Sequence, residues 1–263
     1  MRLCNERDLP DVLELLRADI PNCFYLYVDV ARYGLSHPDM RLWLERREGN
    51  IVSVVMKYFD SMQVYALPGA DMPAIAMQIT TEGVPIVTGT AEVCDALASL
   101  LDGNYKLSHG WTFEVDHFRP FLSPDPIEEA RDDELKECAA LVCMDEGIGG
   151  YYDPVSLARQ FAERRRENMG RNYVIRKEGR IIAHIATYAE FENLAVSSGL
   201  IVHPEWRSQP YGTWLESYLI NTLLKENKRV FSFLRAEKRV KYYKALGIKK
   251  CWINGKLTNI TGA

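Results

Sequence analysis

The chain has 263 residues, of which 47% are hydrophobic and 26% charged, the balance of an ordinary globular protein. A chain of this length is expected to form one large domain or two small ones and to bury a hydrophobic core without disulfide bonds. With 32 Lys and Arg against 36 Asp and Glu, the net charge is −4, which argues against nucleic-acid binding by the whole surface.

The N-terminal residues and the cysteines predict a cytoplasmic protein that holds no metal. The first eight residues lack the apolar segment of a secretion signal, and no apolar run approaches the ~18 residues that cross a membrane. The six cysteines form no C-x-x-C pair and histidine is scarce, so the sequence predicts no zinc site. Scattered cysteines without a secretion signal are typical of reduced thiols in a cytoplasm.

The first half predicts a mixture of helices and strands. Apolar residues at helical spacing after Asp8 predict an opening helix, and a second helix is expected over 39–47. Runs of β-branched and aromatic residues over 51–59 and 62–66 predict two strands. The other elements expected here are a helix over 72–80, a strand over 85–88, a helix over 91–101 and a strand over 111–115.

A proline-rich stretch over 123–126 is the best candidate for a linker, because proline lacks a backbone donor and disfavours helix before it. The expected domains are therefore 1–122 and 123–263. The first half shows a looser version of the element order of the second, without an exact sequence repeat. In the second half, the predicted elements are helices over 127–143 and 154–167, strands over 173–176, 180–188 and 194–203, a helix over 209–225, a strand over 230–234, a helix over 237–245 and a strand over 250–253.

The segment that is most informative about function runs from Leu200 to Leu215, where a predicted strand enters a short loop that opens a long helix. Such a helix start presents free backbone N–H groups and the positive end of the helix dipole, which together form an anion site, usually for phosphate. Arg207 adds a fixed positive charge beside the loop. Taken alone, a strand–loop–helix is usually only structural.

This segment resembles the GNAT superfamily of acyl-CoA-dependent N-acetyltransferases. The family pattern is a strand ending in V-x-P-x-x-R, followed by Gln or Arg and a G-x-G or G-x-A helix start. Val202, Pro204, Arg207 and Gly212 match it, and residues 243–248 resemble the later Tyr-x-x-Leu-Gly-Phe signature. Across both halves the chain is similar to an uncharacterised bacterial group with two tandem GNAT folds, of which only the second keeps the CoA motif.

The resemblance implies an α/β protein with two GNAT-like domains, each a mixed, mostly antiparallel sheet flanked by helices. It implies acetyl-CoA as co-substrate and no metal. Backbone N–H groups of residues 201–203 are then expected to polarise the thioester carbonyl. The cofactor-binding residues that the resemblance implies are Ile201, Val202, His203, Arg207, Ser208, Gln209, Tyr211, Gly212 and Thr213.

The resemblance also implies a base and an acid. The family's acceptor amine attacks the thioester directly, a base takes its proton, and an acid protonates the leaving thiolate. Glu190 aligns with a family glutamate and is the expected base, with Glu192 as second choice; the alternative for Glu190 is a solvated carboxylate in a turn. Tyr243 lies where the family places a tyrosine near the sulfur and is the expected acid; the alternative is an aromatic that packs its helix on the sheet.

Two departures from the family pattern lie in the loop itself. The first and the central glycine of the family are Ser208 and Pro210 here, and proline has no N–H to offer a phosphate. One lost charge-assisted hydrogen bond costs on the order of 1.5–3 kcal/mol. Proline also suits the first turn of a helix, where its N–H would have no intrahelical partner. A CoA site and a repurposed, non-binding loop therefore both stay open.

Residues 228–250 contain nine Lys or Arg and one acid, Glu237, a local excess of +8. The alternatives for this basic segment are a solvated face, attraction of the CoA phosphates or of an anionic acceptor, and nucleic-acid binding, for which no aromatic recognition motif is present. Residues 147–152, rich in Gly and Tyr, connect two helices that the resemblance implies border the acceptor site. The alternatives for this loop are a gate for the substrate and a plain turn.

The leading hypothesis is an N-acetyltransferase that acts on a small-molecule or amino-acid-like amine, with no nucleic-acid or membrane partner and with room for a homodimer. One alternative is a non-catalytic acyl-CoA sensor with a degenerate phosphate loop; another is an interaction protein without a ligand. Thr88-Gly89-Thr90 imitates a strand–loop–helix in the first half but lacks the arginine. The first half is therefore expected to supply a lid, an acceptor wall or an oligomer surface.

Overall fold

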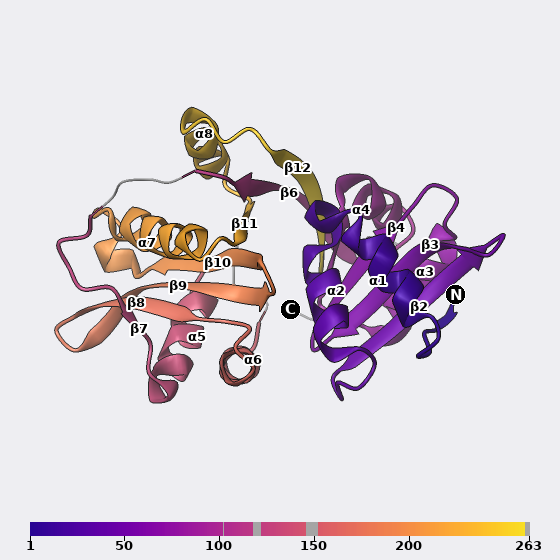
Figure 1. Cartoon of the computed structure of the whole chain (residues 1–263), viewed down its shortest axis with the longest axis horizontal. Coiled ribbons are helices and arrows are strands. Elements are labelled where there is room, and N and C mark those ends of the chain that lie inside the picture. Colours follow the sequence, from indigo (N-terminus) through magenta and orange to yellow (C-terminus); the bar gives the residue numbers. More distant parts are fainter. Residues whose placement is uncertain (102, 118–121, 146–151, 261–263) are drawn as a thin grey trace. The chain divides into compact units, whose positions relative to one another are not determined.

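The computed structural model describes residues 1–101, 103–117, 122–145 and 152–260. It forms two compact units, Met1–Thr112 with Trp252–Ala263, and Phe113–Cys251 (Figure 1). This division differs from the expected one between residues 122 and 123. The last strand, β12 (Cys251–Asn259), pairs antiparallel with β5 (Ile86–Thr90) of the first unit, so residues after 251 belong with the beginning of the chain.

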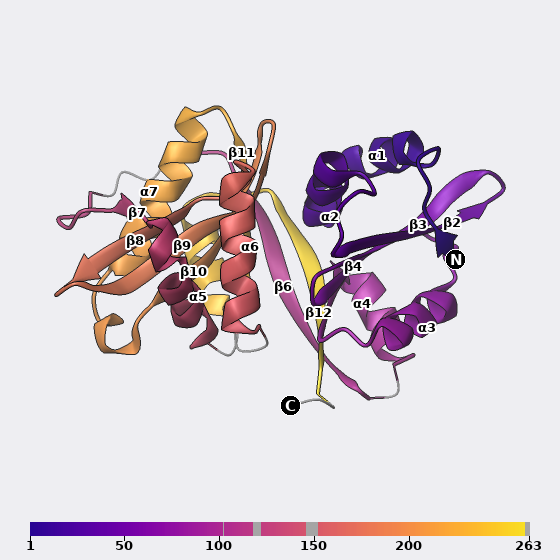
Figure 2. The same ribbon diagram turned by 90° about the horizontal axis from the view of Figure 1, so that it is seen from below.

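In the first unit, three antiparallel strands are followed by a parallel one. Strands β2 (Met40–Arg47), β3 (Asn50–Tyr58) and β4 (Ser61–Ala66) are antiparallel neighbours, and β4 pairs in parallel with β5. The other elements are β1 (Arg2–Leu3), α1 (Leu9–Arg17), α2 (Ile20–Tyr33), α3 (Met72–Glu82), α4 (Ala91–Ala98) and β6 (Tyr105–Val115), which ends in the second unit. Helices α1 and α2 cover one face of this sheet, and α3 and α4 cover the other (Figure 2).

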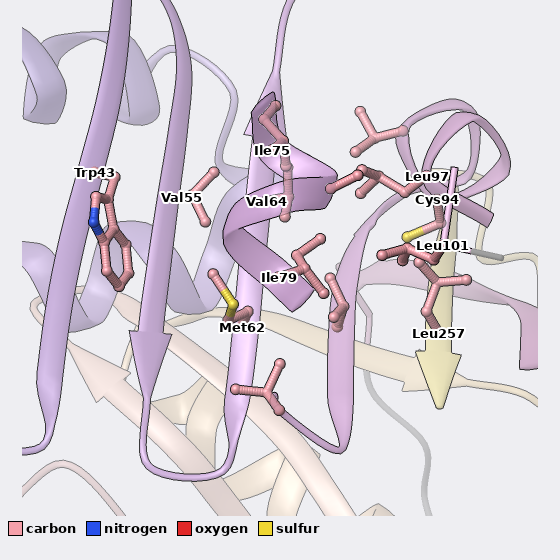
Figure 3. Packing of buried hydrophobic residues seen from close by; sticks show 14 residues of the cluster. Trp43, Val55, Met62, Val64, Ile75, Ile79, Cys94, Leu97, Leu101 and Leu257 are labelled. Carbon is pink, nitrogen blue, oxygen red and sulfur yellow. The ribbon is translucent and has the colours of Figure 1, made fainter. Parts of the chain in front are cut away.

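The core beneath α3 and α4 includes the last strand of the chain. Ile75 and Ile79 of α3 pack with Leu97 of α4 and with Leu257 of β12, all of them fully buried (Figure 3). Burying each such side chain stabilises the fold by about 1.5–3 kcal/mol. A Cβ at Gly255 would overlap the Cys94 side chain, so β12 approaches α4 this closely only because residue 255 is glycine. The first unit therefore depends on residues at the far end of the sequence.

Two sequence expectations fail in the first unit. Residues 39–47 were expected to form a helix, but strand β2 occupies Met40–Arg47 and pairs with β3 along its whole length. Its apolar residues Leu42, Trp43 and Leu44 are all buried, a run that fits a strand covered on both faces as well as it fits a short helix. Helix α2 is not predicted by the sequence; it is interrupted by non-helical dihedrals at Cys23.

The second unit repeats the element order of the first. Its elements are β7 (Glu128–Glu129), the short 3-10 helix η1 (Asp132–Glu134), α5 (Leu135–Cys143), α6 (Pro154–Arg166), β8 (Asn172–Lys177), β9 (Arg180–Phe191), β10 (Leu194–Val202), the 3-10 helix η2 (Pro204–Trp206), α7 (Tyr211–Lys225), β11 (Arg229–Leu234) and α8 (Glu237–Ala245). Strands β7 to β10 are antiparallel neighbours, and β10 pairs in parallel with β11. Helices α5 and α6 lie on one face of the sheet and α7 on the other (Figure 1). The predicted class, mixed and mostly antiparallel sheets flanked by helices, is confirmed.

The parallel pairing of β10 and β11 ends about halfway along β10. Their pairing runs from Leu194 with Arg229 to Ser197 with Ser232, whereas β10 continues to Val202. Beyond Ser197 the backbone groups of β10 that face away from β9 are therefore not taken up by β11. This opening lies directly before the loop that leads into α7.

Among the described residues, no helix is long and apolar enough to cross a membrane.

Candidate functional site

The start of α7 is left open by the protein's own side chains. Pro210 is the N-cap residue, and none of the described side chains caps this helix start. The first intrahelical bond that leaves the turn is Trp214 N–H to Pro210 O at 3.0 Å. The N–H groups of Tyr211, Gly212 and Thr213 precede it and have no intrahelical acceptor, as in every α-helix. Three parallel donors and the positive end of a 15-residue helix thus face outward.

The loop before α7 is folded by its own hydrogen bonds. Trp206 N–H donates to His203 O at 2.9 Å, and Gln209 N–H to Trp206 O at 3.2 Å. Arg207 Nε donates to Val202 O at 3.0 Å, and its guanidinium lies 3.5 Å from Asp145 with about half of the side chain exposed. Arg207 is therefore tied to the end of β10 and still presents charge to solvent beside the helix start.

The predicted loop residues occupy different environments. Ser208 and Gln209 are exposed next to the open helix start. Tyr211 is buried, with its ring edge-on to Trp206 and Trp214, so that only its backbone N–H can meet a ligand at the helix start. A Cβ on Gly212 would lie 3.5 Å from a methyl group of Val202, an ordinary contact that shows how closely α7 packs on β10.

The backbone N–H groups at the end of β10 point alternately toward β9 and away from it. His203 N–H donates to Ile182 O of β9 at 2.8 Å. Because N–H groups of an antiparallel strand alternate between its two edges, the Ile201 N–H also faces β9 and the Val202 N–H faces the opening. This corrects the expectation that residues 201–203 all offer donors: the His203 N–H is already used, and Val202 supplies the N–H that points away from β9.

Glu190, the expected base, lies at the other end of β10. Glu190 pairs with Ala195 of β10. Val202 lies seven residues further along β10, which separates it from Ala195 by about 23 Å at ~3.3 Å per residue. The buried carboxylate of Glu190 accepts two hydrogen bonds from Arg171, at 2.9 and 2.7 Å, and lies 3.3 Å from Lys228 Nζ. The position and these partners fit an ion-pair network at the sheet end and disfavour a base at the loop. Glu192, the second choice, is exposed in the adjoining turn at the same end of the sheet.

Tyr243, the expected acid, is completely buried. Its hydroxyl donates to Glu216 Oε1 of α7 at 2.6 Å, and Arg239 forms an ion pair with the same carboxylate. Burial, reinforced by the Glu216 charge, raises the pKa of Tyr243 well above its ordinary value. The Tyr243 ring also packs against Phe113. This position matches the packing alternative, because an acid for a thiolate must offer its proton to the ligand.

Sequence reasoning missed Glu216 and Arg239, which form the polar interior between α7 and α8. A signal was present: Glu216 follows Leu215 and precedes Leu219 and Ile220 on the buried side of α7, and a buried carboxylate needs a cation. The sequence could not say which arginine of the basic segment supplies it.

The basic segment 228–250 divides into paired and exposed cations. Arg229 and Lys250 lie beside Glu114, and Arg239 beside Glu216. The other cations on α8 are exposed: Lys238, Lys241 and Lys244. Residues 147–151 of the loop expected to border an acceptor lie outside the described residues. Within the described ranges, no group of three or more His, Cys, Asp or Glu is placed to hold a metal ion.

A strand that leaves its parallel neighbour and runs through a loop into an uncapped helix places the protein in the class of α/β folds that offer an anion site at a helix start. Residues 128–248 match the model of the acetyltransferase (GNAT) family. The second unit therefore carries a GNAT domain. No curated protein sequence matches the chain.

Solved structures resemble the chain over both units. A Drosophila protein from a structural-genomics consortium gives a TM-score of 0.71 at 14% identity, covering 100% of this chain and 99% of that one. A GCN5-related N-acetyltransferase-like protein from Streptococcus suis gives 0.65 at 12% identity, with 96% and 100% covered. A tandem GNAT protein from the clavulanic acid biosynthesis pathway gives 0.60 at 16% identity, with 97% of each chain covered. At these identities the likeness concerns the fold, and it confirms the predicted tandem GNAT architecture.

Proposed function

We propose that the second unit transfers an acetyl group from acetyl-CoA to the amine of a small, amino-acid-like acceptor. The observation that carries the proposal is the uncapped start of α7, placed at the end of β10 where β10 has left β11. The GNAT family match over 128–248 supports acyl-CoA as the donor. The acceptor amine is proposed from the family resemblance.

The pyrophosphate of acetyl-CoA would lie against the N–H groups of Tyr211, Gly212 and Thr213. Pro210 removes none of these three donors, because it is the N-cap residue and precedes them. Arg207 and the exposed side chains of Ser208 and Gln209 would add charge and hydrogen bonds around the phosphates. The departure at Pro210 is thus compatible with an anion site.

The pantetheine arm would run along the open edge of β10, with the thioester carbonyl accepting from the Val202 N–H. The acceptor nitrogen attacks the carbonyl carbon, the C–S bond breaks, the amine loses one proton and the CoA thiolate gains one. Glu190 takes no part in these steps because of its distance. Tyr243 can protonate the thiolate only after its hydroxyl has left Glu216.

A second candidate is a non-catalytic acyl-CoA-binding module. It is favoured by one observation: the side chains expected as base and acid are both committed to internal partners. Both candidates bind acetyl-CoA, so turnover separates them. Release of free CoA from acetyl-CoA in the presence of any amine of a broad panel would exclude the module.

A thermal-shift titration with acetyl-CoA tests the proposal first. A ligand at ~100 times its Kd stabilises the native state by ~2.7 kcal/mol, which for a chain of this size is about 5–10 °C in Tm. S-acetylpantetheine, which lacks the pyrophosphate, is the control ligand and should shift the Tm far less. A protein whose Tm does not move at millimolar acetyl-CoA has no such site.

A further inference from the structure

The antiparallel pairing of β9 and β10 is irregular at two places, and the second irregularity restores the register that the first one shifts. Between Val196 and Ser197 the register moves by one residue, so that Tyr188 is an extra residue on β9. Between Ser198 and Ile201 the register moves back, and the extra residue lies on β10. These two β-bulges enclose the point at which β10 leaves β11.

Gly199 forms the bulge on β10. Its φ of +62° lies in the region that favours glycine, and a Cβ there would lie 2.5 Å from the Tyr188 hydroxyl. Its carbonyl accepts a hydrogen bond from His184 Nδ1 at 2.9 Å. A side chain of β9 therefore holds the bulge carbonyl.

His184 is completely buried, and its second ring nitrogen, Nε2, lies 2.9 Å from the side-chain amide of Asn172 on β8. Burial lowers the pKa of His184 to about 4, so the ring is neutral and has one N–H. The Gly199 carbonyl can only accept, which places the proton on Nδ1. Nε2 then accepts from the amide nitrogen of Asn172, whose oxygen and nitrogen exchange by a flip. All of the ring's polar atoms are thereby used on the bulge and its support.

We propose that His184 and Asn172 are positioning residues for acyl transfer, because they fix the bulge that aims the backbone donor at the acyl carbonyl. This inference rests on the proposed function. A one-residue shift in register reverses the direction of every following N–H group. Without the extra residue at Gly199, the Val202 N–H would turn toward β9, where the His203 N–H now bonds Ile182.

The polarisation of the bound thioester measures this role without an acceptor. In the infrared spectrum of carbonyl-13C-labelled acetyl-CoA, a hydrogen bond to the carbonyl lowers its stretching frequency. We expect binding to the wild-type protein to lower the frequency. His184→Leu should lose more than half of this shift, with the Kd for acetyl-CoA within threefold of wild type. His184→Gln should retain most of the shift, because its amide can donate to the Gly199 carbonyl.

Leu157→Ala is the matched control. Leu157 belongs to the buried cluster beneath α5 and α6, which also contains Phe161, the ring that lies against His184. Its side chain cannot hydrogen-bond to the bulge, so its loss weakens the core and should leave the shift unchanged. Should His184→Leu fail to fold, Asn172→Ala leaves the ring in place, removes its support and should reduce the shift in part. An equal shift in wild type, in His184→Leu and in Asn172→Ala overturns the inference while the proposed function stands. A wild-type protein that does not bind acetyl-CoA overturns both.

Discussion

Helix α3, which follows β4, and helix α7, which follows β10, begin in opposite ways. At α3 the Asp71 carboxylate accepts from Ala74 N–H at 3.0 Å, and Asp71 N–H donates to Glu45 Oε2 at 2.9 Å. At α7 the corresponding N-cap is Pro210, and the first-turn donors are left open. Two carboxylates thus occupy in the first unit the place that the second unit offers to an anion.

The strands that lead into these helices differ in the same sense. In the first unit β3 and β4 keep one register over all six pairs, from Ser53 with Ala66 to Tyr58 with Ser61. In the second unit β9 and β10 carry the two bulges and the His184 contact. The comparison teaches that one topology serves as a scaffold in both units, while the local residues decide whether it can hold a phosphorylated ligand.

Lowering the pH should produce the largest difference in stability between the two units. The folded pKa of His184 is about 4, below the value of ~6.5 in an unfolded chain, so the unfolded state takes up the proton first. The neutral ring's contribution is complete above pH ~6.5 and falls as the pH decreases to 4, by about 3 kcal/mol. Urea titrations at pH 7 and pH 4.5 should show this loss.

His184→Gln, which does not titrate, should lose much less stability over the same pH interval. In the first unit, Arg2 holds the pKa of Asp8 well below its ordinary value, so that contribution is lost only below pH ~4. A wild-type slope that equals the His184→Gln slope between pH 6.5 and 4.5 would contradict the assignment of a neutral buried histidine.

Pro210→Asp transfers the cap of α3 to α7. A carboxylate at this N-cap would accept from Thr213 N–H, as Asp71 does from Ala74 N–H, and would repel the ligand's phosphates. We expect the Kd for acetyl-CoA to rise at least ~30-fold, about 2 kcal/mol, while the free protein becomes more stable by up to ~1 kcal/mol. Calorimetric titration measures the first effect, and urea unfolding the second. Unchanged affinity would place the ligand elsewhere.

Asp71→Ala is the reciprocal change in the first unit. Removing the cap should cost about 1 kcal/mol of stability, because Ala74 N–H loses its acceptor. The Kd for acetyl-CoA should stay within twofold of wild type, since the proposed ligand contacts only the second unit. Parallel urea unfolding and calorimetry check both values; a large loss of affinity would show that the first unit takes part in binding.

Pro210→Gly should have the smallest effect. Pro210 precedes the three open donors, so glycine restores an N–H outside the first turn and adds flexibility to the unfolded chain. We expect the affinity for acetyl-CoA to change by less than threefold. A tenfold gain in the calorimetric titration would mean instead that the missing N–H of Pro210 does weaken the site.

The local pattern of the second unit was predictable from the sequence, and its spatial relations were not. The residues from Val202 to Gly212 fix a strand, a loop and a helix start through their own chemistry, and the structure has this order. The distance of Glu190 from the loop could not be predicted, because it depends on the register of the strands, which a sequence motif does not give. Glu216 was missed because burial depends on partners from another helix.

The pairing of β12 with a strand of the first unit was equally unpredictable from the sequence. Leu257 and Gly255 show that the segment is apolar and tightly packed, but not which sheet receives it. Likewise the run from Leu42 to Leu44 satisfies a strand or a helix by local pattern, and only its pairing with β3 decides.

Because β12 belongs to the first unit, that unit cannot be completed until the end of protein synthesis. The ribosome must add the 139 residues from Phe113 to Cys251 before the strand that pairs with β5 exists. At about 5–20 residues per second, the nascent first sheet waits roughly seven to thirty seconds with β5 unpaired on that side. The second unit is itself complete only when Cys251 has been added, so the half of the chain that is made first cannot finish folding before the half that is made later.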